Sequence, residues 1–169
     1  GDIQFAKAQF DVLKGSTTKF VANDAINKSV FIQDNIAFDS SYVPLQYFAK
    51  AEYMEHIFDF HKALDYLDTI LVTYSSHPII DDVLFKKAQI YKKLSQYDIA
   101  IAELTKIIDN YYFEVIADDA LYDLAMIYAD VYKNYDKAKE LLLQLITDFP
   151  VSIYVDMARL QLNKFKNNS

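Results

Sequence analysis

Apolar and small residues recur along the chain at intervals of three, four and seven, with polar residues between them. Four segments share one pattern: an aromatic residue, an alanine three residues later and an apolar residue two further on. These segments begin at Phe5, Phe48, Phe85 and Tyr122. Because such intervals place side chains on one face of a helix, each segment predicts an amphipathic helix.

The alanines of this pattern define a repeat. The first series is Ala8, Ala51, Ala88 and Ala125, spaced by 43, 37 and 37 residues, and the second is Ala25, Ala63, Ala100 and Ala138. In the last three units the second alanine follows the first by 12 or 13 residues, which leaves room for two helices and a tight turn. Small residues at the crossing let paired helices approach to about 8–10 Å. The recurrence therefore predicts a solenoid of helical hairpins.

The pattern predicts nine helices, at residues 3–14, 20–36, 43–57, 60–74, 79–94, 97–110, 115–132, 135–148 and 151–166. We interpret them as a single all-α domain over residues 1–169, a right-handed α–α superhelix. It comprises a degenerate hairpin at 3–36, three repeats at 43–74, 79–110 and 115–148, and a capping helix at 151–166, whose tail 164–169 is polar.

Polar residues, proline and glycine mark the predicted helix ends. Residues 76–82 predict a cap at Ser76, with Pro78 in the first helical turn. Residues 148–150, Asp-Phe-Pro, predict a similar helix start before the last helix. Gly15 is predicted to close the first helix in the left-handed conformation. Residues 16–18, Ser-Thr-Thr, predict a capping turn.

Composition narrows the function. The chain has two glycines and no cysteine, which excludes glycine-rich nucleotide loops, disulfides and thiolate chemistry. Its net charge is −7 and Arg159 is its one arginine, so we expect neither nucleic-acid binding nor attraction to an anionic membrane. No apolar run reaches 18 residues, and we predict no membrane insertion.

The polar residues do not form a pattern typical of catalysis. His56, His61 and His77 lack metal-ligand spacing, and we predict them to be exposed turn residues. The acidic pairs at 81–82 and 118–119 recur at one repeat position, which favours stabilisation of helix N-termini. We therefore predict no catalytic residue, metal or cofactor, and a protein that is not an enzyme.

The pattern resembles the tetratricopeptide repeat. The family's small residue in the first helix matches Ala51, Ala88 and Ala125, its alanine in the second helix matches Ala63, Ala100 and Ala138, and the preceding aromatic matches Phe60, Tyr97 and Tyr135. The resemblance covers residues 43–166 well and 3–36 weakly. The units are 37 residues long rather than about 34, and they lack the family's tryptophan and turn glycine.

Three segments suggest a subgroup of this family. The unit ending at residues 148–152, with the stretches 5–8 and 21–25, is similar to the C-terminal part of bacterial, Bacteroidetes-type envelope proteins with tetratricopeptide repeats. This resemblance implies a location in the periplasm or at the outer membrane, although a cytoplasmic location is also compatible with the sequence.

The resemblance implies a scaffold that binds a partner protein or peptide in a concave groove lined by the first helix of each hairpin. The groove residues it implies are Phe48, Glu52, Glu55, Phe85, Gln89, Lys92, Tyr122 and Met126. The aromatic members form a ladder, which Phe5 would extend, and their rings either contact the partner or pack between neighbouring helices. The alternative function is self-association, in which the first or last helix pairs with another copy.

Overall fold

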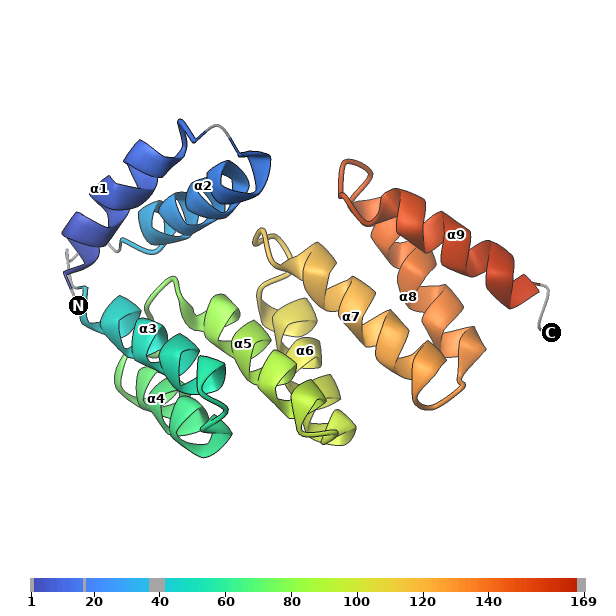
Figure 1. Ribbon diagram of the computed structural model, residues 1–169. Helices are drawn as coiled ribbons and strands as arrows, with labels where there is room; N and C mark the ends of the chain where they lie inside the picture. Colours follow the sequence, from blue (N-terminus) through green and yellow to red (C-terminus); the bar gives the residue numbers. More distant parts are fainter. Residues whose placement is uncertain (1, 17, 37–41, 167–169) are drawn as a thin grey trace. The chain divides into compact units, whose positions relative to one another are not determined.

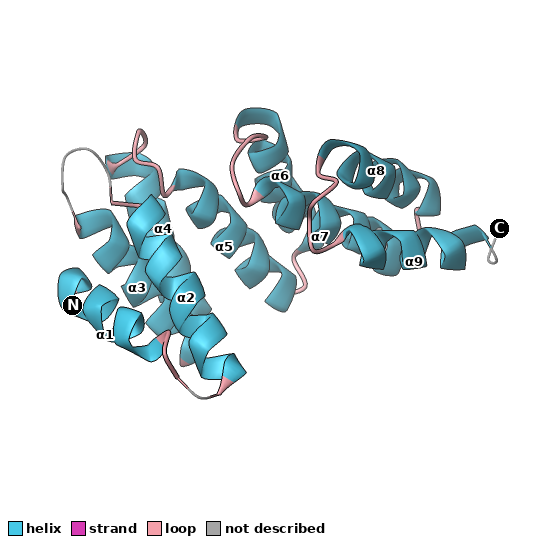
Figure 2. Ribbon diagram, turned by 90° about the horizontal axis from the view of Figure 1, so that it is seen from above, coloured by secondary structure: helices cyan, strands magenta, loops and turns pink. Residues whose placement is uncertain are grey.

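The described part of the chain, residues 2–16, 18–36 and 42–166 of a computed structural model, contains helices and turns and no strand (Figures 1 and 2). It divides into two compact units, residues 1–83 and 84–169. Thr17 of the predicted capping turn and residues 167–169 of the predicted polar tail lie outside the described ranges.

The elements follow the predicted order. Unit 1 contains α1 (Ile3–Leu13), α2 (Lys19–Asp34), α3 (Val43–His56), α4 (Phe60–Thr73) and the start of α5 (Ile80–Lys93). Unit 2 contains the rest of α5, α6 (Tyr97–Asn110), α7 (Ala117–Asp130), α8 (Tyr135–Asp148) and α9 (Val155–Lys166). The predicted all-α fold of helical hairpins is confirmed. The predicted organisation as one domain stays a prediction.

The repeated alanines form the centres of the hairpins. Six of them have no exposed surface, namely Ala51, Ala63, Ala88, Ala100, Ala125 and Ala138, and Ala25 is 2% exposed. Leucines and isoleucines one or two turns away are also buried, including Leu67, Leu104 and Leu142. The small residues thus allow close helix approach, and the larger ones exclude water around each crossing.

The first hairpin departs from the repeat. Ala8, predicted to lie at a crossing, is exposed, and so is Phe5. Helix α1 instead turns Ile3 and Phe10, which are seven residues apart, toward the rest of unit 1. An amphipathic helix buries one face. Because α1 buries the face that carries Ile3, the residues at the repeat positions, Phe5 and Ala8, are exposed to solvent. Phe5 is 64% exposed, and its place in an aromatic ladder that contacts a partner stays a prediction.

The turns inside the three regular hairpins share one backbone conformation. Phe58, Ser95 and Lys133 have φ of 63°, 58° and 54°. The amide of each following residue donates to a carbonyl five residues earlier in the first two turns and six residues earlier in the third, at 2.9 Å in all three. A left-handed residue of this kind ends a helix sharply. Gly15 does not do so, contrary to the prediction: its φ is not positive, and α1 ends with the Gly15 amide bonded to the Val12 carbonyl at 3.2 Å.

The connectors between regular hairpins also repeat. In each connector, two successive backbone hydrogen bonds run from an amide to the carbonyl three residues earlier. They link residues 74, 77 and 80 in the first, 111, 114 and 117 in the second, and 149, 152 and 155 in the third. These turns use residues that the sequence pattern assigned to helices, so α7 and α9 begin at Ala117 and Val155 rather than at 115 and 151.

His77 lies inside the first of these connectors and is 9% exposed, so its prediction as an exposed turn residue is wrong. Its Nδ1 accepts a hydrogen bond from the Ile79 amide at 3.2 Å, in the turn just before α5. The Ser152 hydroxyl accepts from the Tyr154 amide at 3.1 Å in the same way before α9. His56 and His61 are exposed, as predicted.

Candidate partner-binding surface

In unit 1, α2 contacts two of the three predicted groove residues of α3. The Phe48 ring is 4% exposed and lies against the Phe31 ring of α2, with centroids 5.0 Å apart. Lys28 of α2 pairs with Glu52, with 2.6 Å between Nζ and Oε1. These contacts place α2 beside the face of α3 that the resemblance assigns to a partner (Figure 1).

Helix α2 also contacts the start of α5. The Asn35 side-chain amide, just beyond the end of α2, donates to Asp82 Oδ2 at 2.8 Å. Burial raises the pKa of Asp82 to about 7, with a further upward contribution from Asp81, while the hydrogen bond from Asn35 acts in the opposite direction. The carboxyl group of Asp82 is therefore partly protonated near neutral pH.

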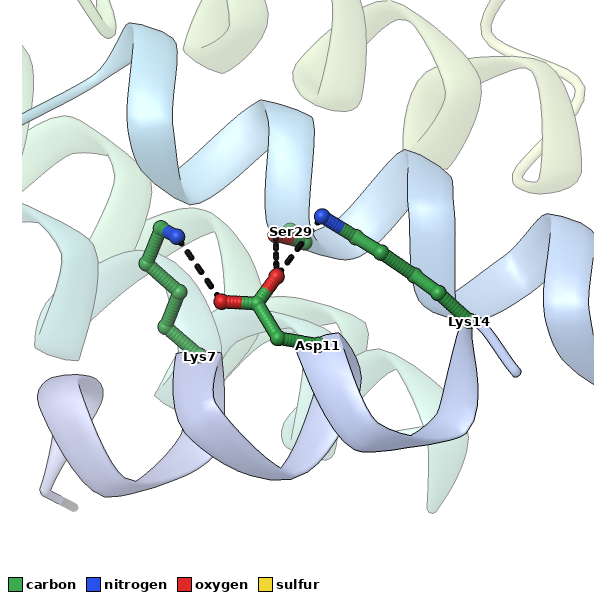
Figure 3. Close-up of polar contacts among 4 residues, drawn as sticks. All are labelled: Lys7, Asp11, Lys14 and Ser29. Atoms are coloured by element: carbon green, nitrogen blue, oxygen red, sulfur yellow. Dashed lines mark hydrogen bonds and ion pairs between the residues drawn. The ribbon is translucent and has the colours of Figure 1, made fainter. Parts of the chain in front are cut away.

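The α1–α2 hairpin is held by a polar cluster that the sequence analysis missed (Figure 3). Asp11 of α1 accepts from the Ser29 hydroxyl at 2.6 Å and pairs with Lys7 at 3.0 Å and Lys14 at 2.6 Å. The lysine and serine hydrogen bonds hold the pKa of the Asp11 carboxyl well below its usual range. Ser29 is 1% exposed. Its position four residues after Ala25, on the buried face of α2, was the available signal.

In unit 2, the predicted groove residue Tyr122 packs against the connector before α9. Its ring stacks on that of Tyr154, with centroids 4.6 Å apart and planes 18° from parallel. The Tyr154 hydroxyl donates to Asp119 Oδ1 at 2.5 Å. Burial raises the pKa values of both Asp119 and Tyr154. Tyr122 thus packs within the chain in this structure.

Polar side chains join the first helices of neighbouring hairpins in unit 2. Lys92 of α5 pairs with Asp123 of α7, with 2.8 Å between Nζ and Oδ2, and Gln89 donates to the same carboxylate. Phe85 on α5 and Met126 on α7 are partly exposed. Helices α5 and α7 therefore lie side by side, and both contribute predicted groove residues.

The structure thus places the eight predicted residues in four situations. Phe48 and Glu52 contact α2, Tyr122 contacts Tyr154, and Gln89 and Lys92 contact Asp123. The remaining three, Glu55, Phe85 and Met126, are partly exposed. The binding of a partner by these residues stays a prediction.

A hollow in unit 1 measures about 180 Å³ and is lined by residues that include Ile3, Asp11, Ile32 and Tyr42. This is below the roughly 300–1,000 Å³ of small-molecule sites. Within residues 2–16, 18–36 and 42–166, no group of three His, Asp or Glu side chains is arranged to hold a metal ion. None of the helices described is long and apolar enough to span a membrane.

Comparison with known proteins gives one family. The tetratricopeptide repeat matches residues 82–111 and 119–152, which include α5, α6, α7 and α8 almost entirely. No curated protein matches the chain. The chain therefore contains two segments similar to the tetratricopeptide repeat, a family that generally mediates protein–protein interactions.

Proposed function

We propose that the chain is a scaffold that binds a partner protein through the first helices of its hairpins, with α5 and α7 as the contact surface in unit 2. The observation that carries this proposal is the bridge from Gln89 and Lys92 to Asp123, which holds α5 beside α7 within the two matched repeats. A rigid pair of helices with fixed polar groups between partly exposed apolar side chains is suited to hold a helix or an extended peptide.

The test is capture of partners from an extract of the native source by the tagged chain, identified by mass spectrometry. We expect Phe85→Ala with Met126→Ala to lower capture at least about fivefold, because two apolar anchors contribute roughly 1–3 kcal/mol together. Tyr122 is left intact, since its ring is stacked on Tyr154 and truncation would disturb the fold.

The matched control places the same kind of change on the second helices. Ile99 on α6 and Leu143 on α8 are 42% and 55% exposed. Their double alanine variant should retain capture, with far-UV circular dichroism showing that both double variants keep their helices. Equal capture by the groove variant and the unmodified chain would contradict the proposal.

The cell-envelope location suggested by the sequence is part of this proposal. A partner in an envelope assembly supports it, and it is tested by fractionating cells of the native source and probing each fraction with an antibody. Recovery in the cytoplasmic fraction alone would contradict the envelope location and leave the binding surface unaffected.

Self-association is the second candidate, and α9 favours it. Met157 and Leu160, three residues apart on α9, are 40% and 62% exposed, while Ala158 and Phe165 are buried. A helix with apolar side chains on a second face is suited to pack on another helix. Sedimentation velocity at two concentrations separates the candidates: a monomer at both contradicts self-association, and a dimer lost in Leu160→Lys supports it.

A further inference from the structure

Helix α2 presents to its neighbours a face with a defined chemical pattern. Lys28, Phe31 and Asn35 are spaced by three and four residues, which places them on one side of the helix. The Lys28 ammonium lies 5.8 Å from the centre of the Phe31 ring, and the Asn35 amide also bonds the Phe31 carbonyl at 3.1 Å. The three groups are thus oriented by contacts within their own segment.

Each of these groups meets a residue of α3 or of the start of α5. The cation meets a carboxylate, Glu52, the ring meets a ring, Phe48, and the amide meets a second acid, Asp82. The receiving surface is therefore one aromatic ring between two acidic side chains, complementary to a helix that carries a cation, a ring and an amide.

A different face of α2 holds α1. Ala25, Ser29 and Ile32 are buried, and Ser29 bonds Asp11. The α1–α2 hairpin thus has its own packed interior, and its contact with α3 uses a separate set of side chains.

The contact between α2 and α3 is weaker than a hairpin core. The side chains of Lys28 and Glu52 are 43% and 31% exposed, and an ion pair open to water contributes little. Holding Asp82 out of water opposes docking, as its raised pKa indicates. The favourable contribution falls mainly on the contact between the Phe31 and Phe48 rings, whose planes are tilted by 37°. Such an arrangement resembles a bound ligand more than a shared core.

We propose that the groove-facing side of unit 1 recognises amphipathic helices that present a cation, an aromatic ring and an amide at positions i, i+3 and i+7, with α2 as the resident occupant that such a partner displaces. This rests on the proposed function and adds to it the chemistry of the partner. Only molecules in which α2 has left the site can bind a partner. The apparent affinity is therefore the intrinsic affinity multiplied by the fraction of molecules in which the site is open.

The test uses the full chain and a fluorescein-labelled peptide with the sequence of residues 19–36 as the probe. Phe31→Ala in the chain should weaken docking of α2 and raise the affinity for the peptide at least tenfold over the unmodified chain, measured by fluorescence anisotropy. Phe20→Ala is the matched control, because Phe20 lies on the same helix and is 87% exposed. It should leave the affinity unchanged.

Two further arms test recognition itself. The peptide with Phe31→Ala should bind the opened chain at least tenfold more weakly. A chain with Phe31→Ala and Glu52→Lys should bind the natural peptide more weakly, by less than tenfold because the pair is open to water, and should bind a peptide with Lys28→Glu better than the natural one, because the ion pair is restored with its charges exchanged.

Far-UV circular dichroism checks each chain, and Lys28→Glu replaces Phe31→Ala as the opening variant if the latter does not fold. The proposal would be overturned if the natural peptide bound the opened and the unmodified chains with equal affinity. It would also be overturned if the natural peptide and the Phe31→Ala peptide bound the opened chain equally. Because partner capture by unit 2 is measured with Phe85 and Met126, failure here is distinguishable from failure of the proposed function.

Discussion

The buried ion pair of the α5–α6 hairpin gives the sharpest stability prediction. Lys87 on α5 and Glu103 on α6 are 7% and 5% exposed, and their Nζ and Oε1 atoms are 3.3 Å apart. The second carboxylate oxygen of Glu103 accepts from Lys106 at 2.8 Å, but the Lys106 side chain is 53% exposed. The Glu103 carboxylate is therefore paired with one buried cation, Lys87, and one solvent-exposed cation, Lys106.

Glu103→Ala leaves the Lys87 ammonium inside the protein without this carboxylate, and we expect a loss of about 3–5 kcal/mol in the free energy of unfolding. Lys106→Ala removes only a solvated pair three residues apart and should cost less than about 0.5 kcal/mol. The double variant Lys87→Met with Glu103→Leu should cost less than Glu103→Ala alone, because no charge is left buried.

The assay is urea unfolding followed by far-UV circular dichroism, since the chain has no tryptophan. The urea midpoints of the variants are compared only where the dependence of the unfolding free energy on urea is the same. A constant dependence means that the surface exposed on unfolding is unchanged. If Glu103→Ala costs no more than Lys106→Ala, or if the double variant is the least stable of the set, the reasoning from burial is refuted.

Three further predictions concern the backbone, titration and packing. Ser95→Gly should raise the free energy of unfolding by about 1 kcal/mol in thermal or urea unfolding, because φ of 58° strains a residue with a Cβ, and no gain would contradict this. Asp82, whose pKa is raised from 3.8 to about 7 in the folded state, binds its proton more tightly there, so its contribution to stability is complete below about pH 4 and falls as pH rises to 7. Asp82→Asn should flatten that part of the stability profile relative to the unmodified chain, and parallel profiles would contradict the burial of this carboxyl. Ala88→Phe should cost about 1–3 kcal/mol by overpacking a residue with no exposed surface, whereas Ala8→Phe, at an exposed position, should change the urea midpoint little; equal costs would contradict the packing.

The sequence predicts the helices well because their signal is local. Intervals of three, four and seven residues place the ends of α4, α6 and α8 within one residue of the structure. The connectors were less predictable, since their turns consume residues such as Val151 and Ser152 that fit a helical pattern equally well. Ala8 was assigned by analogy with the later alanines, and the choice of the Ile3 face in α1 depends on contacts that no local pattern encodes.

The candidate site was predictable only in part. The resemblance supplied the groove-facing positions, and the structure does place Gln89 and Lys92 at a bridge between first helices. The contacts of α2 with α3 and α5 were missed, because they join residues far apart in the sequence. Lys28 and Glu52 are 24 positions apart, and Asn35 and Asp82 are 47 apart. Periodicity within a helix carries no information at that range.

The docking of α2 on α3 is tested most directly by nuclear Overhauser effects between phenylalanine ring protons in the full chain. Ring centroids 5.0 Å apart in Phe31 and Phe48 predict strong cross-peaks between these two rings, which disappear in Phe31→Leu. Helical α3 and α4 with no cross-peak between the two rings would contradict the placement of α2 on the groove-facing side of unit 1.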